Sequence, residues 1–194
     1  MAARGDAAVA EYTEKFDKVK LSASEFRISA DDLKKAHQSL DAALLASLRK
    51  SIANVRKYQS EIFIGTKNTH PGIRYTPLNR VACCIPGASA PLPSTVMMTA
   101  VPAQAAGVKD IVVLSPPRYK GGIHPVILGL CYELNITEVY RLGGAQAVAA
   151  LAWGTETITK VDKIVGPDTM SCSLRKKNVS GWWIWIRLPG RAMY

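Results

Sequence analysis

The sequence predicts an α/β protein of Rossmann-like parallel β-α units, preceded by a helical amino-terminal segment. Between residues 79 and 167, short apolar runs alternate with helix-like runs, and Gly or Pro separates them. The apolar runs begin every ~25–30 residues, the length of one strand-turn-helix-turn unit. We therefore expect a helical segment and connector over 1–78, a Rossmann-like domain over 79–167 and an aberrant tail over 168–194.

The amino-terminal segment shows helical periodicity. Residues 2–17 place Val9, Tyr12 and Phe16 on one face, which predicts a first helix. Ser29 is placed to cap a single long helix from Ala30 to about Phe63. The apolar stripe expected along that helix comprises Leu40, Leu44, Leu48, Ile52 and Val55. Residues 67–78 contain two prolines and a glycine, which indicates a connector.

The β-α block then follows element by element. Strands are expected at 80–85, 110–114, 138–142 and 163–165, and helices at 95–106, 126–134 and 145–153. Ser94 is a plausible cap for the first of these helices, and Gly107 is placed to end it. Pro102 should kink that helix or mark a register break.

Composition excludes several classes of protein. The net charge of +10 has no basic stripe behind it, so we expect no nucleic-acid partner. No apolar run reaches ~18 residues and the amino terminus lacks the apolar core of a signal peptide, so we expect no membrane partner. The four cysteines lack metal-ligand spacing, which favours free thiols in a reducing compartment and a cytoplasmic location.

Two junctions between a strand and a helix are candidate ligand sites. Gly143 and Gly144 follow one predicted strand and open a helix, an arrangement that lets a ligand approach the backbone. The same junction also suits tight packing without a ligand. Gln146 favours the ligand, because an amide in an Ala-rich first turn has no evident packing role. The second junction, at 85–95, is either a ligand loop or a proline-stiffened turn.

Three strings carry a family resemblance: CIPGASAPLPSTVMM at 84–98, RLGGAQAVAALAWGTET at 141–157 and KVDKIVGP at 160–167. With RGDAAVAEYTEKFD near the amino terminus, they resemble the amino-terminal half of histidinol dehydrogenase. The resemblance implies oxidation of L-histidinol to L-histidine, the last steps of histidine biosynthesis, with NAD as oxidant, zinc as a cofactor and a homodimeric assembly.

The resemblance also implies site residues. Gln146 stands at the family's glutamine contact to NAD, beside Gly143 and Gly144. Cys84 stands where the family has an aromatic contact, and Thr169 stands where it has an asparagine. The family's zinc ligands and catalytic pair lie beyond the point where the match stops, so no catalytic or metal-binding residue is expected here. The three histidines, His37, His70 and His124, are not expected to form a metal cluster with carboxylates, and His124, at a helix entry, is expected to cap the helix or to face solvent.

The tail differs in composition from the rest of the chain. Residues 173–194 contain the string WWIWI and no acidic residue. Shifting the reading frame by one base over 183–194 permits VD-M-D-S-A-A-G-P-S-D-V, which is similar to the family's next segment. We therefore expect a frameshift after about residue 167 and an inactive, truncated fragment, and sequencing of the coding DNA tests this directly. The alternative function is a non-catalytic nucleotide-binding or interaction domain.

Overall fold

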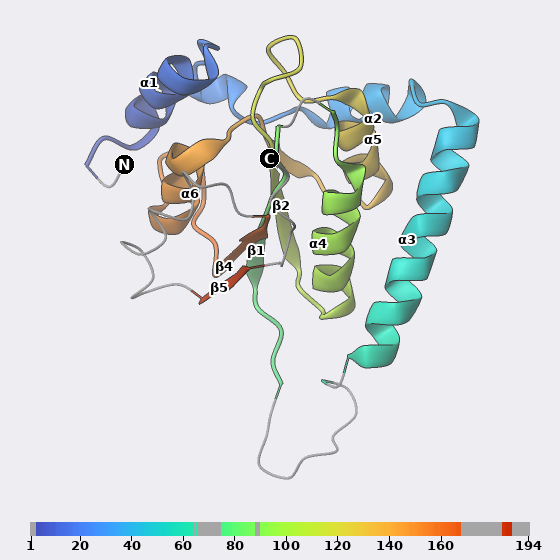
Figure 1. Cartoon of the computed structure of the whole chain (residues 1–194). Helices are drawn as coiled ribbons and strands as arrows, with labels where there is room; N and C mark the ends of the chain where they lie inside the picture. Colours follow the sequence, from blue (N-terminus) through green and yellow to red (C-terminus); the bar gives the residue numbers. More distant parts are fainter. Residues whose placement is uncertain (1–2, 64, 66–74, 88–89, 168–183, 188–194) are drawn as a thin grey trace.

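The computed structural model describes residues 3–63, 65, 75–87, 90–167 and 184–187. Its centre is a parallel sheet in the order β3-β2-β1-β4-β5, with the helices on both faces (Figure 1). The α/β, Rossmann-like fold class is therefore confirmed. The strands are β1 (Arg80–Cys84), β2 (Asp110–Leu114), β3 (Glu138–Tyr140), β4 (Lys163–Gly166) and β5 (Ile184–Arg187).

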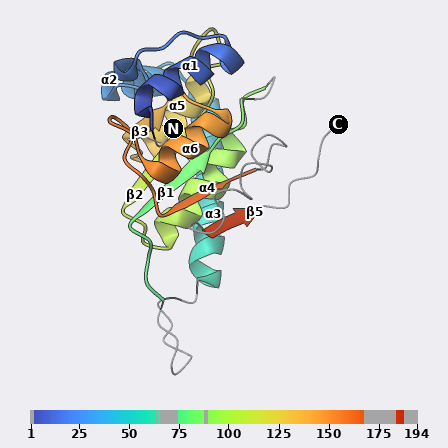
Figure 2. The ribbon, with the colours of Figure 1, turned by 90° about the vertical axis from the view of Figure 1, so that its left-hand side faces the viewer.

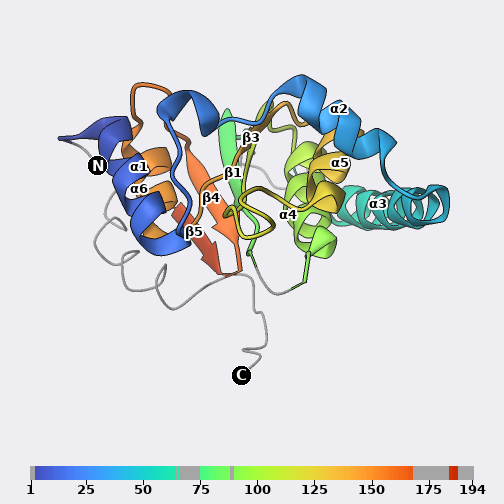
Figure 3. The same cartoon turned by 90° about the horizontal axis from the view of Figure 1, so that it is seen from above.

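Helices cover the two faces of the sheet unequally. One face carries α4 (Pro93–Ala105) and α5 (Pro125–Glu133), with α2 (Ala30–Gln38) and α3 (Ala42–Ile62) packed outside them (Figure 3). The other face carries α6 (Gly144–Trp153), covered in turn by α1 (Gly5–Asp17) (Figure 2). A short 3₁₀ turn at Ala23–Glu25 lies between α1 and α2 in the chain.

The direction of the chain across the sheet explains this division. From β1 to β3 the chain moves outward in one direction, whereas β4 returns to pair with the free edge of β1. Right-handed crossovers then place α4 and α5 on one face and α6 on the other. The reversal creates a topological switch point between β1 and β4, where ligands of open α/β sheets bind at the carboxyl ends of the strands.

Each face has its own apolar core. Cys83, Val113 and Val139 point from the strands into the core beneath α4 and α5. Ala82, Val112 and Tyr140 belong to the opposite core, which also contains Val9 and Phe26 of the amino-terminal segment. The amino-terminal segment is thus part of the packing of the sheet rather than an appendage to it.

The prediction of a single helix from Ala30 to about Phe63 is wrong. The chain breaks between α2 and α3, where Asp41 has an extended backbone and its carboxylate accepts hydrogen bonds from the N–H groups of Ala43 and Leu44, both at 3.0 Å. Aspartate competes with the helical backbone in this way and therefore favours a cap over a helix interior. The end of α2 and the turn after it pack closely on α5 at Gly129, where a Cβ would lie 3.1 Å from His37 Cα and 2.7 Å from Leu40 Cδ1.

We expect Asp41→Ala to lower the free energy of unfolding by about 1–2 kcal/mol, because two N–H groups lose their acceptor. Urea unfolding of the purified chain measures this. Asp31→Ala is the matched control, since Asp31 lies in the first turn of α2 and, in the described structure, its side chain does not cap that helix end. Equal losses in the two variants would contradict the capping role of Asp41.

The other predicted bounds agree with the structure within two residues, except that α1 begins at Gly5 rather than at residue 2. Helix α4 begins at Pro93 rather than Thr95, and the residue before it is Leu92, so the predicted Ser94 cap is wrong. Proline suits the first helical position because its missing N–H would have no partner there. Pro102 lies within α4 and does not end it, and Gly107, at φ +80°, follows the helix as predicted.

The carboxyl-terminal tail contributes one strand to the described structure. β5 pairs in parallel with β4, with Lys163 opposite Ile184 and Gly166 opposite Arg187. An I-W-I-R run has the apolar and aromatic character typical of strands. The proposed domain bounds and the frameshift stay predictions. Within the described part of the chain, Cys83, Cys84 and Cys131 form no disulfide bond, and no helix is long and apolar enough to span a membrane.

Candidate functional site

The switch point between β1 and β4 is tightly built. Gly166 ends β4 with φ +149°, a conformation that residues with a side chain rarely adopt. A Cβ at this position would lie 2.5 Å from the carbonyl oxygen of Cys84, at the end of β1. Cys84 therefore lies at the switch point, and its side chain is half-buried. This is the residue at which the family resemblance implies a contact to the cofactor.

The Gly143–Gly144 junction lies at the same carboxyl edge of the sheet. Gly143 is extended, and a Cβ there would lie 2.5 Å from Pro116 Cβ, so this glycine permits close packing of two loops. Gly144 has φ +67°, and a Cβ there would lie 2.9 Å from Gln146 Oε1. The Gln146 side chain thus folds back over Gly144. Both glycines are needed for the geometry of the junction itself.

Gln146 is only 5% exposed, and it has a partner that the sequence did not reveal. Its Nε2 donates a hydrogen bond to Asp17 Oδ2 at 3.3 Å, so the expectation that it has no packing role is wrong. Asp17 is the last residue of α1, far away in the sequence. Because an ionised carboxylate only accepts, it fixes which end of the carboxamide faces α1.

Asp17 connects this amide to a nearby cation. Its side chain is 4% exposed, and its Oδ1 lies 3.7 Å from Arg118 Nε. Burial raises the pKa of the Asp17 carboxyl above its ordinary value, and the charge and hydrogen bond of Arg118 oppose that shift. Arg118 in turn donates from Nη1 to the Gly87 carbonyl at 3.2 Å. Four segments therefore meet at the carboxyl edge: the end of α1, the first turn of α6 and the loops that follow β1 and β2.

A cavity of about 350 Å³ lies next to Arg118, between the loops that follow β1 and β2. Gly87, Ser115 and His124 are among the residues that line it. His124 caps α5, as predicted, because its Nδ1 accepts the Val126 N–H at 3.2 Å. Residues 88–89 of the same loop lie outside the described part of the chain.

Two of the residues considered in the sequence fall outside the description of the fold. Thr169 and His70 lie outside the described residues. His37 contacts a single carboxylate, since its Nε2 lies 2.7 Å from Glu133 Oε2, and Arg49 Nε lies 2.7 Å from Glu133 Oε1. Among the residues that the structure describes, no group of three or more His, Cys, Asp or Glu side chains is arranged to hold a metal ion.

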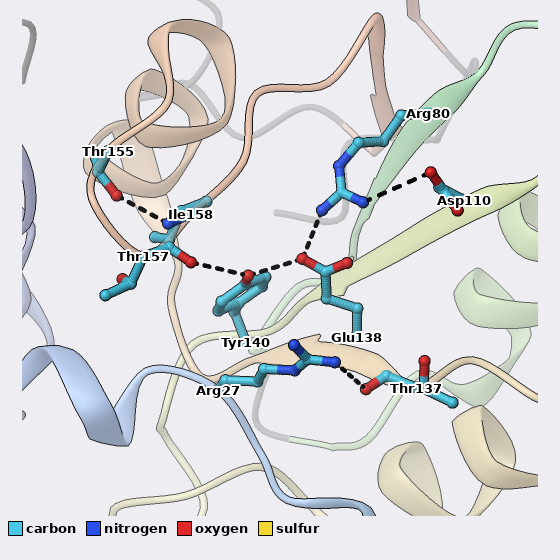
Figure 4. A network of polar contacts seen from close by, with 9 residues as sticks. All are labelled: Arg27, Arg80, Asp110, Thr137, Glu138, Tyr140, Thr155, Thr157 and Ile158. Carbon is cyan, nitrogen blue, oxygen red and sulfur yellow. Dashed lines mark hydrogen bonds and ion pairs between the residues drawn. The ribbon is translucent and has the colours of Figure 1, made fainter.

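A second polar network lies at the opposite, amino-terminal edge of the sheet (Figure 4). Arg80 contacts both Glu138 and Asp110, and Tyr140 Oη donates to Glu138 Oε1 at 2.7 Å. Burial alone would raise the pKa of Glu138, but the hydrogen bonds from Arg80 and Tyr140 outweigh it and lower that pKa. Because its members contact one another and bridge three strands, this network has a structural role, although Arg80 Nε is buried without a hydrogen-bond partner in the described structure.

Comparison with known proteins agrees with this architecture. A family model described as histidinol dehydrogenase matches residues 1–186. The chain is 46% identical over 184 residues to histidinol dehydrogenase of Geobacillus kaustophilus and 44% identical to that of Rhodopirellula baltica, covering 92% of this chain in each case. It covers 43% and 40% of those two proteins, so the chain spans less than half of their length.

A solved structure gives the same result. The crystal structure of histidinol dehydrogenase from Elizabethkingia anophelis superposes with a TM-score of 0.84 at 34% identity, covering 95% of this chain and 44% of that one. The similarity therefore extends over nearly the whole of this chain and under half of the solved one.

Proposed function

The chain belongs to the histidinol dehydrogenase family, and we propose that it forms the NAD-binding part of an enzyme that oxidises L-histidinol to L-histidine. The observation that supports this most directly is the reversal of strand order between β1 and β4, with the glycine junction and Gln146 at the carboxyl edge. Dinucleotides bind at this position in doubly wound sheets.

The residues at this edge offer a dinucleotide hydrogen-bonding groups and close access to the backbone. NAD, when bound, accepts a hydride from the substrate. Asp17 uses one N–H of the Gln146 carboxamide and leaves the second N–H and Oε1 for a hydroxyl or amide of the cofactor. Gly143 and Gly144 keep side chains away from the backbone at the start of α6. Cys84 stands where the family resemblance implies an aromatic contact, so its own side chain does not provide that contact.

Zinc, the substrate L-histidinol and the homodimer are proposals drawn from the family. The residues that the structure describes do not fit a zinc site, since they contain no suitable cluster of ligands. We therefore assign no step of the reaction to a metal held by these residues. The proposed contribution of this chain is to bind and orient the oxidant.

A binding experiment tests the proposed function. We expect NAD to bind the purified chain and Gln146→Ala to weaken that binding by about 0.5–1.5 kcal/mol, the value of one hydrogen bond. Isothermal titration calorimetry or saturation-transfer NMR measures the change. Gln38→Ala is the matched control, because Gln38 is an exposed glutamine at the end of α2.

The outcomes separate the alternatives left open by the sequence. Weaker binding of NAD by Gln146→Ala than by Gln38→Ala supports a cofactor contact at Gln146. Equal binding by all three chains would place the cofactor elsewhere. Absence of binding by the unmodified chain would refute the proposed function and leave Gly143–Gln146 with a packing role alone.

A further inference from the structure

The cavity beside Arg118 has the chemistry of an anion site. Its lining residues include the guanidinium of Arg118, the hydroxyl of Ser115 and the imidazole of His124. None of the lining residues is acidic. Helices α4 and α5 both begin next to the cavity, and neither has an acidic residue in its first turn. Helix amino termini carry partial positive charge and favour an anion.

Ser115 is a second, independent feature that points to a ligand in this cavity. The residue is 4% exposed and lines the cavity at the carboxyl end of β2. Its backbone N–H is satisfied by the Tyr140 carbonyl at 3.1 Å, but its hydroxyl makes no hydrogen bond within the described part of the chain. Because Ser115 lines the cavity, this hydroxyl is available to donate a hydrogen bond to a ligand bound there.

Arg118 and His124 have further N–H groups that can donate hydrogen bonds to a ligand. A guanidinium has five N–H groups, of which Arg118 uses one on the Gly87 carbonyl and directs another toward Asp17. Because Nδ1 of His124 accepts the Val126 N–H, the proton of the neutral ring is on Nε2, which can donate. The His124 ring is held edge-on against Tyr119, with ring centroids 4.4 Å apart.

We propose that this cavity binds a phosphate group, with the Arg118 guanidinium and the Ser115 hydroxyl as its principal donors. A tetrahedral oxyanion has acceptors in several directions, as donors from separate loops require, and arginine is well matched to it. The phosphate is either part of the dinucleotide, in which case this inference rests on the proposed function, or a free anion. L-Histidinol does not suit the cavity, because its amine is cationic.

Titration with inorganic pyrophosphate, ADP-ribose and NAD tests the proposal, with backbone amides followed by ¹⁵N NMR. We expect pyrophosphate to shift amides of residues that line the cavity. Arg118→Gln should raise its dissociation constant by about tenfold or more, as for a lost charge-assisted hydrogen bond. Ser115→Ala, which leaves the charge unchanged, should raise it by about two- to tenfold. Lys50→Gln is the control, since it removes one positive charge from an exposed position on α3.

Each outcome decides the question. Equal weakening by Arg118→Gln and Lys50→Gln would show a general charge effect and overturn the proposal, as would shifts confined to other parts of the chain. If NAD binds equally to the unmodified chain, Arg118→Gln and Ser115→Ala, and pyrophosphate does not shift the cavity amides, the proposed function stands and this inference fails. If pyrophosphate binds as expected and NAD does not, the phosphate is a free anion and the proposed function fails. Competition between ADP-ribose and pyrophosphate supports the dinucleotide as its source.

Discussion

Phe26→Ala is expected to lower the free energy of unfolding by about 3–5 kcal/mol. Phe26 is 0% exposed and is among the largest fully buried side chains of the described structure. It packs in the core that contains Val112, Tyr140 and Leu142, although it precedes the predicted Rossmann-like domain by more than fifty positions in the chain. Truncation removes that packing and leaves a cavity beneath the sheet.

Denaturant unfolding monitored by circular dichroism measures this loss, and Phe16→Ala is the matched control. Phe16 lies on α1 but is 61% exposed, so its truncation should change the free energy of unfolding by well under 1 kcal/mol. A small, equal effect of both substitutions would contradict the shared core. The expected loss is a large fraction of the 5–15 kcal/mol that stabilises an ordinary domain.

The shared core bears on how the chain is divided. The backbone of the amino-terminal segment also joins the sheet, since Ile28 N–H donates to the Val139 carbonyl at 2.8 Å and Arg141 N–H donates to the Phe26 carbonyl at 2.8 Å. A boundary at residues 78–79 stays a prediction. If the Phe26 prediction holds, residues 79–167 depend on the preceding segment for their stability.

The β-α units were predictable because their signals are local. Strand β2 was placed at its observed bounds, 110–114, because an apolar run lies between Gly107 and the Pro116-Pro117 turn. The start of α6 followed from two glycines, which few other contexts require together. The order of the strands, by contrast, has no local signal, because it depends on which strand edges pair with one another. The family resemblance supplied more of the expected site than periodicity did.

The contacts at the candidate site were not predictable, because they join distant segments. Nothing near Gln146 in the sequence indicates that Asp17 is its partner, and nothing near Glu133 indicates Arg49 and His37. The break at Asp41 had a local signal, an aspartate three residues before Leu44, which the longer apolar stripe obscured. A polar residue such as Gln146 on an apolar helix therefore indicates that a hydrogen-bond partner exists, but it does not identify that partner.

Gln146→Glu is expected to destabilise the chain by about 2–4 kcal/mol at neutral pH, because it places a second carboxylate against Asp17 in a buried site. The substitution preserves the shape of the side chain, so the loss reflects charge. Arg118 lies near only one of the Asp17 oxygens, at 3.7 Å, and is too exposed to compensate for two buried anions.

The pH dependence of this loss has a definite sign. Each carboxylate raises the pKa of the other in the folded chain, so the folded state binds more protons than the unfolded state above an ordinary carboxyl pKa of about 4. The penalty of Gln146→Glu should therefore grow as the pH rises above about 4 and shrink as the pH falls toward it. Urea unfolding of the unmodified chain and the variant at pH values of roughly 4.5, 6 and 8, all above the ordinary carboxyl pKa, measures the difference.

The double variant Asp17→Asn, Gln146→Glu provides the matched control. It exchanges the amide and the carboxylate, so an amide N–H introduced at position 17 can donate to the carboxylate introduced at position 146, and a single negative charge remains. We expect it to recover stability to within about 1 kcal/mol of the unmodified chain and to lose the added pH dependence. Recovery would show that Asp17 and Gln146 are coupled in solution. A double variant that is no more stable than Gln146→Glu would refute that coupling, and with it the role of Asp17 in orienting the carboxamide at the proposed cofactor site.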